Sequence, residues 1–130
     1  MKRLLLDTHA LLWWLIDDGE NSLGKKAKNA IADSRNVVYV SAASTWEISI
    51  KKGLGKLSAP DDMDSIVEDE GFSKLPITLF HGDQAGMLPE HHKDPFDRML
   101  IAQAQAEGLT LVTCDEKIHK YNIRIMDASK

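Results

Sequence analysis

The sequence contains almost no cysteine. Cys114 is the single cysteine in 130 residues, so no disulfide can form within the chain. The five histidines are not arranged with it at zinc-finger spacing, which excludes a structural zinc site of that kind. A lone free thiol is typical of a reducing compartment, and we therefore expect a cytoplasmic protein.

Long apolar runs are also missing. The longest, ALLWWLI at residues 10–16, is far shorter than the roughly 20 residues that a membrane-spanning helix needs. The stretch MKRLLLDTHA reaches an aspartate and a histidine too early for a secretion signal. The sequence therefore predicts no association with a membrane.

The chain also has no excess of positive charge. The chain carries 16 Lys and Arg residues against 20 Asp and Glu residues, which gives a formal net charge of −4. Proteins that bind nucleic acids or anionic membranes through their overall charge are usually basic, so bulk electrostatics favours neither class.

What the sequence does contain is a regular alternation of strand-forming runs and helical patterns. This order favours an α/β fold in which a mostly parallel central sheet is flanked by helices. The length and the 43% hydrophobic content fit a single domain, residues 1–130. We predict strands at 4–6, 37–40, 75–77, 109–115 and 123–126. We predict helices at 8–16, 23–34, 61–70, 79–88 and 95–107, and a further helix that begins at 42 and ends at a glycine-rich turn at 53–55. Ser22 is the expected cap of the helix at 23–34.

The stretch DPFDR at residues 94–98 opens the last predicted helix. Asp94 is a strong N-cap, and Pro95 suits the first helical position. Asp97 falls at the third helical position, where a carboxylate can reach back to the cap and interacts favourably with the helix dipole. Helix initiation alone could account for both aspartates, and the helix is expected to stop at Gly108.

Acidic residues recur just beyond the ends of predicted strands. Asp7 and Asp115 each end a strand, and Glu47 lies one to two turns into the helix after the second strand. Open α/β sheets place their sites at the carboxyl ends of strands, so these acids and Asp97 are expected to converge. Each acid also has a structural alternative, because an aspartate can cap the next helix and Ser44 with Glu47 has the spacing of a capping box.

Together the four acids favour a metal site. Carboxylates gathered at one edge of a sheet repel one another strongly unless a divalent cation neutralises them. Oxygen ligands without a thiolate favour a hard ion, Mg²⁺ or Mn²⁺, over zinc, and such sites usually act on phosphates. His9, His91 and His92 lie near the acids in the sequence, but histidines are commonly satisfied by hydrogen bonds, and we do not include them among the ligands.

Four segments stand in a characteristic order: LLLDTHALLWWL, STWEISIKKGLGKL, DPFDRMLIAQA and LVTCDEKI. Together they resemble the PIN domain of the VapC type, the toxin half of bacterial toxin–antitoxin pairs. The resemblance covers nearly the whole chain and implies a three-layer PIN-like fold. It also implies a metal-dependent ribonuclease whose four acids fall at Asp7, Glu47, Asp97 and Asp115. Thr113 matches a hydroxyl residue that the family often uses to orient a carboxylate or water.

The resemblance further implies a mechanism and partners. Asp7, Asp97 and Asp115 would hold one Mg²⁺, and Glu47 would complete the ligand shell through water or support a second ion. A water acidified by the ion would attack an RNA phosphodiester in line while the ion neutralises the developing charge. The family also implies homodimers and a small antitoxin that blocks the site. Whether Asp94 contacts the metal or only caps its helix stays open.

An RNA substrate calls for basic residues near the acids, since phosphate contacts by Lys and Arg normally supply the affinity. With the four ligands set aside, 20 − 4 = 16 acidic residues remain against 16 basic ones, which leaves room for a basic rim. Lys51, Lys52, Lys56 and Arg98 are candidates for this rim. For Lys51 and Lys52 a solvated helix face is the simpler interpretation.

The tryptophans could stack on bases but have a simpler explanation. Trp13 and Trp14 belong to an apolar run that is expected to fill a core or a partner interface. Trp46 is likewise predicted in the core.

Two functions of other classes remain as alternatives. A Mg²⁺-dependent phosphatase would also use a strand-end aspartate, but it needs a second aspartate close behind the first, and DTHA at residues 7–10 has none. A catalytically silent PIN-like module would only bind RNA or a protein. The four acids argue against this module, because an idle concentration of charge destabilises a fold.

Overall fold

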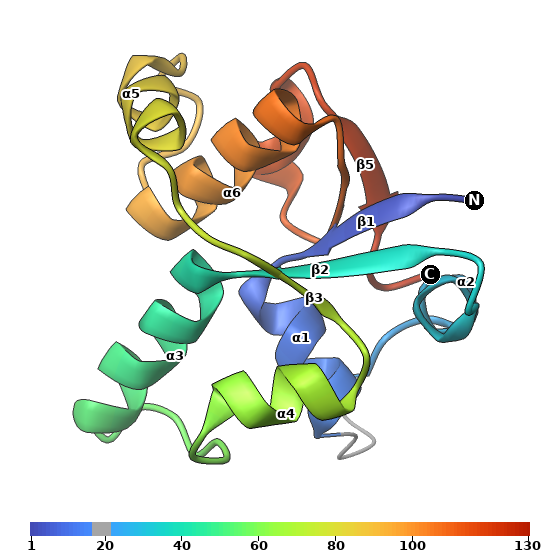
Figure 1. Ribbon diagram of the computed structural model, residues 1–130. Helices are drawn as coiled ribbons and strands as arrows, with labels where there is room; N and C mark the ends of the chain where they lie inside the picture. The colour runs from blue at the N-terminus through green and yellow to red at the C-terminus, as the bar shows by residue number, and fades with distance from the viewer. Residues whose placement is uncertain (17–21) are drawn as a thin grey trace.

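A five-stranded sheet runs through the centre of the molecule (Figure 1). The structure is a computed structural model that describes residues 1–16 and 22–130. All the paired strands run parallel in the order β3-β2-β1-β4-β5, which confirms the predicted α/β class. The strands are β1 (Arg3–Leu6), β2 (Val37–Ser41), β3 (Ser73–Leu75), β4 (Thr110–Thr113) and β5 (Arg124–Asp127). β3 ends before the predicted 75–77 because Pro76 has no N–H to extend the ladder.

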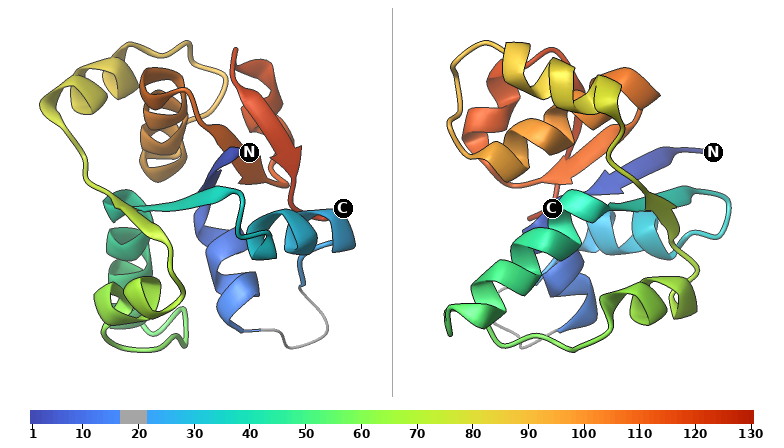
Figure 2. Two further views of the ribbon diagram at one scale, coloured as in Figure 1. Left: turned by 45° about the vertical axis from the view of Figure 1, so that its right-hand side comes forward. Right: turned by 60° about the vertical axis from the view of Figure 1, so that its left-hand side comes forward.

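Helices cover both faces of the sheet and make the fold three-layered (Figure 2). Side chains alternate across a strand, so Leu4 and Leu6 enter one buried cluster and Leu5 enters the other. The first cluster also contains residues of α1 (Thr8–Leu15), α2 (Lys25–Ala32), α3 (Ala42–Gly53) and α4 (Met63–Asp69). The second cluster also contains residues of α5 (Leu79–Met87), α6 (Pro95–Glu107) and the 3₁₀ helix η1 (Glu116–Lys120). Within the described ranges, none of these helices has the length and apolarity to cross a membrane.

The start of α2 differs from the prediction. Its N-cap is Gly24 and it begins at Lys25, whereas Ser22 was the expected cap. The Gly24 N–H donates to the Ala128 carbonyl at 2.9 Å. A Cβ on Gly24 would lie 2.2 Å from the backbone carbon of Lys130, so only glycine leaves room for the carboxyl-terminal backbone. Contacts between distant parts of the chain therefore set this boundary.

The predictions for the tryptophans have different outcomes. Trp13 and Trp14 are half-buried and pack against the core, so α1 is less enclosed than its composition indicated. The prediction that Trp46 is a core residue is wrong, because its side chain is 60% exposed and meets the Phe96 ring edge-on at 5.2 Å. The helix α3 instead turns the face that carries Glu47 inward.

The strand order places a site at one particular edge. From β1 the chain proceeds outward in one direction to β2 and β3, and in the other direction to β4 and β5. The carboxyl ends of β1 and β4 therefore flank a topological switch point, where open α/β sheets form their binding crevices. Because α6 leads into β4 and packs on the sheet, its first turn lies at this same edge.

Candidate active site

Four elements bring the predicted acids to the carboxyl edge of the sheet. Asp7 follows β1, Asp115 lies two residues after β4, Asp97 is in the first turn of α6, and Glu47 is in the second turn of α3. Asp7 and Asp115 also cap α1 and η1, so each aspartate combines capping with a place at this edge. We call this group of four acids at the carboxyl edge the acidic crevice. The expected capping box of Ser44 and Glu47 is absent, because Ser41 caps α3.

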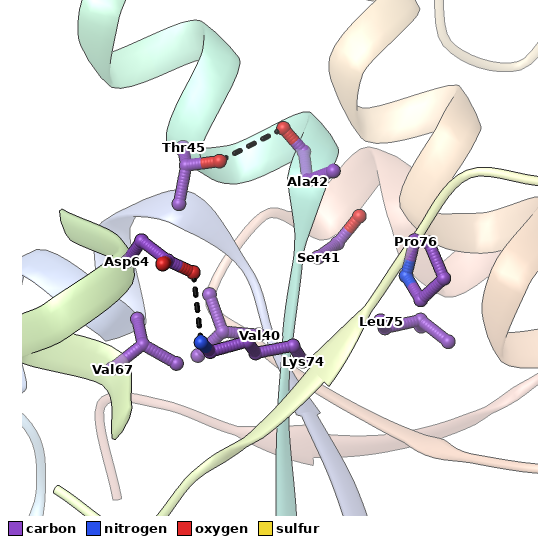
Figure 3. Close-up of a pocket in the computed structure, with 9 residues that line it drawn as sticks. All are labelled: Val40, Ser41, Ala42, Thr45, Asp64, Val67, Lys74, Leu75 and Pro76. Atoms are coloured by element: carbon purple, nitrogen blue, oxygen red, sulfur yellow. Dashed lines mark hydrogen bonds and ion pairs between the residues drawn. The ribbon is translucent and has the colours of Figure 1, made fainter. Parts of the chain in front are cut away.

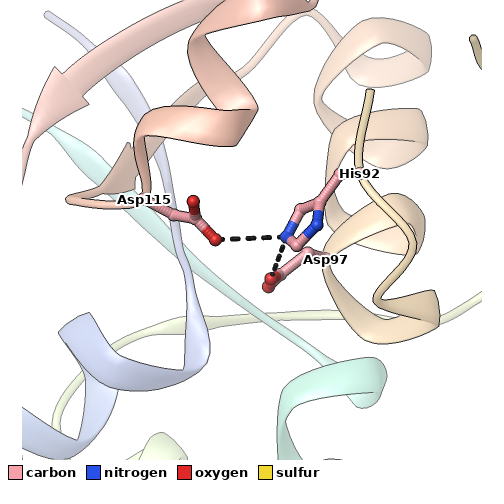
Figure 4. A group of neighbouring side chains, drawn as sticks. All are labelled: His92, Asp97 and Asp115. Atoms are coloured by element: carbon pink, nitrogen blue, oxygen red, sulfur yellow. Dashed lines mark hydrogen bonds and ion pairs between the residues drawn. The ribbon is translucent and has the colours of Figure 1, made fainter. Parts of the chain in front are cut away.

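His92 joins Asp97 to Asp115 (Figure 4). Its Nε2 atom lies 2.8 Å from Asp97 Oδ2 and 3.1 Å from Asp115 Oδ2. The candidate ligand atoms of these three residues all lie within 4.8 Å of one another, and no other such group was found in the part of the chain that is described. The imidazole is buried. His92 was not among the ligands predicted from the sequence, where only its position five residues before Asp97 points to such a role.

Thr113 connects Asp7 to Asp115. Its hydroxyl is fully buried, hydrogen-bonds the Asp7 carboxylate, and accepts the Asp115 N–H at 3.1 Å. Burial raises the pKa of Asp7, and the negative charge of Asp115 adds to this effect, while hydrogen bonds from Thr113 and the Ala10 N–H oppose it. The carboxylate of Asp7 is therefore oriented but short of positive charge.

Asp97 is in a similar position. Burial raises the pKa of its carboxyl group to about 6, and the charges of Asp94 and Asp7 contribute, while the hydrogen bond with His92 acts in the opposite direction. Asp94 Oδ1 accepts the N–H groups of Phe96 at 2.9 Å and of Asp97 at 3.1 Å. Asp94 therefore performs the capping, which leaves the side chain of Asp97 free to face the crevice.

Glu47 is held apart from the His92 group. Its Oε1 accepts the Thr8 hydroxyl at 2.6 Å, and its Oε2 accepts the Lys51 ammonium at 2.7 Å. The pKa of Lys51 is raised by this hydrogen bond, and the charges of Asp94 and Asp97 add to the rise. The ammonium of Lys51 is thus a source of positive charge at the acidic edge that the protein itself provides.

Most side chains of the predicted basic rim are paired with other groups of the protein. Lys51 pairs with Glu47, and Lys52 pairs with Asp61 and donates to the Pro60 carbonyl at 3.0 Å, so neither is merely a solvated side chain. Lys56 is exposed. The assignment of Arg98 to the rim is wrong: its guanidinium donates to four backbone carbonyls, those of Ala85, Leu88, Pro89 and His92, at 2.8–3.1 Å.

Arg98 therefore closes the loop between α5 and α6. We expect Arg98→Met to lower the free energy of unfolding by about 2 kcal/mol, because carbonyls without a donor cost roughly 1–3 kcal/mol when they stay buried. Urea denaturation followed by circular dichroism measures this change. Arg124→Met is the matched control, since Arg124 is exposed on β5 and should alter stability little. An equal decrease in the free energy of unfolding of the two variants would contradict the role assigned to Arg98.

A cleft of about 340 Å³ lies between α4 and the β2–β3 side of the sheet (Figure 3). The Asp64 carboxylate and the Lys74 ammonium pair across it at 2.9 Å. Its lining is mainly apolar and includes none of the four predicted acids. Hydrolytic chemistry is therefore expected at the acidic crevice and not in this cleft.

Part of the chain is similar to a curated ribonuclease. Over 55 residues it is 42% identical to Ribonuclease VapC16 of Mycobacterium tuberculosis. The match spans 39% of this chain and 39% of that protein.

Whole-chain similarity is found among solved structures. VapBC2 from Rickettsia felis, bound to a DNA fragment from its promoter, matches with a TM-score of 0.69 and 13% identity over 95% of this chain and 97% of that chain. DNA-bound VapBC from Salmonella typhimurium matches with a TM-score of 0.67 and 21% identity over 98% of each. These similarities establish the fold.

The sequence of residues 4–123 matches the PIN domain family. This range contains β1 without its first residue, β2, β3 and β4, but not β5, and it includes Asp7, Glu47, Asp97 and Asp115. The chain belongs to the PIN domain family.

Proposed function

We propose that the protein is a VapC-type endoribonuclease that uses a divalent ion, Mg²⁺ or Mn²⁺, to hydrolyse RNA phosphodiesters. Asp7, Asp97 and Asp115 are the proposed ligands, with Glu47 in support. The observation that carries this proposal is the burial of Asp7 and Asp97 beside Asp115, which raises the pKa of both buried carboxyls. Such a site stabilises a cation better than it stabilises its own negative charges.

The donor set fits a divalent ion. His92 Nε2 carries at most one proton, yet it lies within hydrogen-bond distance of one oxygen of Asp97 and one of Asp115. Nε2 can therefore donate a full hydrogen bond to only one of these two oxygens. This arrangement indicates a site with unused capacity for a ligand.

The side chains of the crevice would each have a defined task. When bound, the ion would supply an acidified water and neutralise charge on the phosphate. Thr113 fixes the carboxylate of Asp7, and Thr8 fixes that of Glu47. Lys51 lies where it can hold Glu47 or meet an incoming phosphate. The chain therefore contributes orientation and charge, and none of these residues is needed as a strong base.

The substrate and partners are proposed from relatives. RNA is chosen because the partly matching protein from M. tuberculosis is named a ribonuclease. An antitoxin partner and a homodimer are chosen because the structures with this fold include VapBC complexes and a toxin–antitoxin complex from Klebsiella pneumoniae. We expect residues 1–130 to act as one domain in the cytoplasm, which agrees with the free thiol of Cys114.

A substrate comparison tests this proposal. Protein purified away from any partner and stripped of metal is incubated with single-stranded RNA and with single-stranded DNA of the same sequence, with Mg²⁺, Mn²⁺ or a chelator. We expect cleavage of the RNA only when metal is present. Equal cleavage of DNA would refute the ribonuclease assignment, and cleavage in chelator would refute the metal dependence.

One observation favours the silent binding module as a second candidate. The ion pair between Glu47 and Lys51 neutralises part of the crevice without any metal. Calorimetric titration with Mn²⁺ separates the two functions. Binding supports the nuclease, whereas the absence of binding at millimolar Mn²⁺ would support a module that only binds a partner.

A further inference from the structure

We infer that His92 is a nitrogen ligand of the proposed ion and that the resulting nitrogen–oxygen site favours a transition ion such as Mn²⁺ over Mg²⁺. This inference rests on the proposed function. It changes the expected chemistry of the site, because carboxylates alone make an all-oxygen site that suits Mg²⁺ well.

The spacing of the three side chains suits ligands of one ion. An octahedral ion with bonds of about 2.1 Å places adjacent ligand atoms about 3 Å apart. His92 Nε2 lies 2.8 Å from Asp97 Oδ2 and 3.1 Å from Asp115 Oδ2 (Figure 4). The imidazole needs only to carry its proton on Nδ1 for Nε2 to present a lone pair toward the same point as the two carboxylates. The three side chains can therefore bind an ion with little rearrangement.

The backbone of His92 is held in place from both sides. Its N–H donates to the Tyr121 hydroxyl at 3.0 Å, and its carbonyl accepts from Arg98 at 3.1 Å. The Tyr121 hydroxyl in turn donates to the Pro89 carbonyl at 2.6 Å. His92 lies in the segment between α5 and α6, where side chains are usually mobile and exposed, yet the residue is only 8% exposed. Such anchoring is what a metal ligand on a loop requires.

The ligand type determines which ion is preferred. Mg²⁺ favours oxygen ligands and retains several waters, whereas imidazole nitrogen binds first-row transition ions more strongly. A site with one imidazole and two or three carboxylates therefore gains affinity for Mn²⁺ without a matching gain for Mg²⁺. Removal of the imidazole should reduce this preference.

Pulsed electron paramagnetic resonance of the Mn²⁺-loaded protein tests the inference directly. Nitrogen bound to Mn²⁺ modulates the spin echo, and the modulation frequencies change when ¹⁴N is replaced by ¹⁵N. We expect nitrogen modulation in the wild-type protein and a changed frequency when only histidine is labelled with ¹⁵N. This experiment needs no substitution and so does not depend on the folding of a variant.

Variants then identify the histidine. His92→Gln should abolish the nitrogen modulation and lower the affinity for Mn²⁺ by about tenfold, while the affinity for Mg²⁺ changes little. His9→Gln and His91→Gln are the matched controls and should keep the modulation. His9 is exposed on α1, and His91 is exposed and packs against the Tyr121 ring.

The outcomes separate this inference from the proposed function. Bound Mn²⁺ without nitrogen modulation, or modulation that persists in His92→Gln, overturns the role of His92 and leaves the carboxylate site intact. Failure of the wild-type protein to bind Mn²⁺ at all overturns the metal-dependent function, and the inference with it.

Discussion

Asp97→Asn is expected to reduce RNA cleavage by more than about 100-fold, because loss of even an outer-shell partner of a metal site typically costs 10- to 100-fold. The side chain of Asp97 faces His92 and the crevice, and burial together with neighbouring charges raises its pKa to about 6. The amide of asparagine has similar size but no negative charge for a cation. Initial rates of cleavage at saturating Mn²⁺ measure the effect.

Asp94→Asn is the matched control for this experiment. It makes the same chemical change three residues earlier on the same helix, and asparagine is as good an N-cap as aspartate. Because Asp94 Oδ1 accepts two N–H groups at the start of α6, we expect this variant to fold and to cleave RNA nearly as well as the wild type. Undiminished cleavage by Asp97→Asn would show that Asp97 is not a ligand. A comparable loss in Asp94→Asn would show that Asp94 also serves the metal.

The second large effect is a loss of stability of the metal-free protein as the pH rises. The pKa of Asp97 is raised from 3.8 to about 6 in the folded state, so the folded protein holds this proton more tightly than the unfolded chain does. The stabilising contribution is complete below pH 4 and is lost as the pH passes through 6. For Asp97 alone the loss approaches about 3 kcal/mol by pH 7, and the raised pKa of Asp7 acts in the same direction.

Urea denaturation of chelator-treated protein between pH 4 and pH 7 measures this loss. Asp97→Asn removes the titrating group, so the difference in unfolding free energy between the wild type and this variant should change by about 3 kcal/mol across the range. The carboxyls with lowered pKa, Asp33, Asp61 and Asp127, titrate below this range. Addition of Mn²⁺ at pH 7 should restore stability. A difference that does not vary with pH would contradict the electrostatic account of the crevice.

Features determined by neighbouring residues were predictable from the sequence. The N-cap at Asp94 and the stop at Gly108 depend on local backbone geometry, and the structure confirms both, with Gly108 in the left-handed conformation at φ 66°. The strands and the parallel sheet follow from the alternation of strand-forming runs with helical patterns. The positions of Asp7 and Asp115 at one edge follow from the rule for open α/β sheets, because each lies within two residues of the end of a central strand.

Features that depend on distant contacts were not predictable. Arg98 resembles a surface residue in the sequence, yet four carbonyls of the preceding loop and helix use its donors. His92 is directed into the crevice by Tyr121, which lies 29 residues further along the chain. Trp46 is exposed because α3 turns inward the face that carries Glu47, which is held by Thr8. In each case the deciding partner comes from another element.

The most direct test of the account is the rate of RNA cleavage by isolated, metal-free protein as Mn²⁺ is titrated into the sample. We predict no cleavage before metal is added, a rate that rises with Mn²⁺ until it saturates, and no comparable rise with Asp97→Asn. Cleavage by the metal-free protein, or equal saturation curves for the wild type and Asp97→Asn, would contradict the claim that the acids at this edge of the sheet hold the catalytic ion.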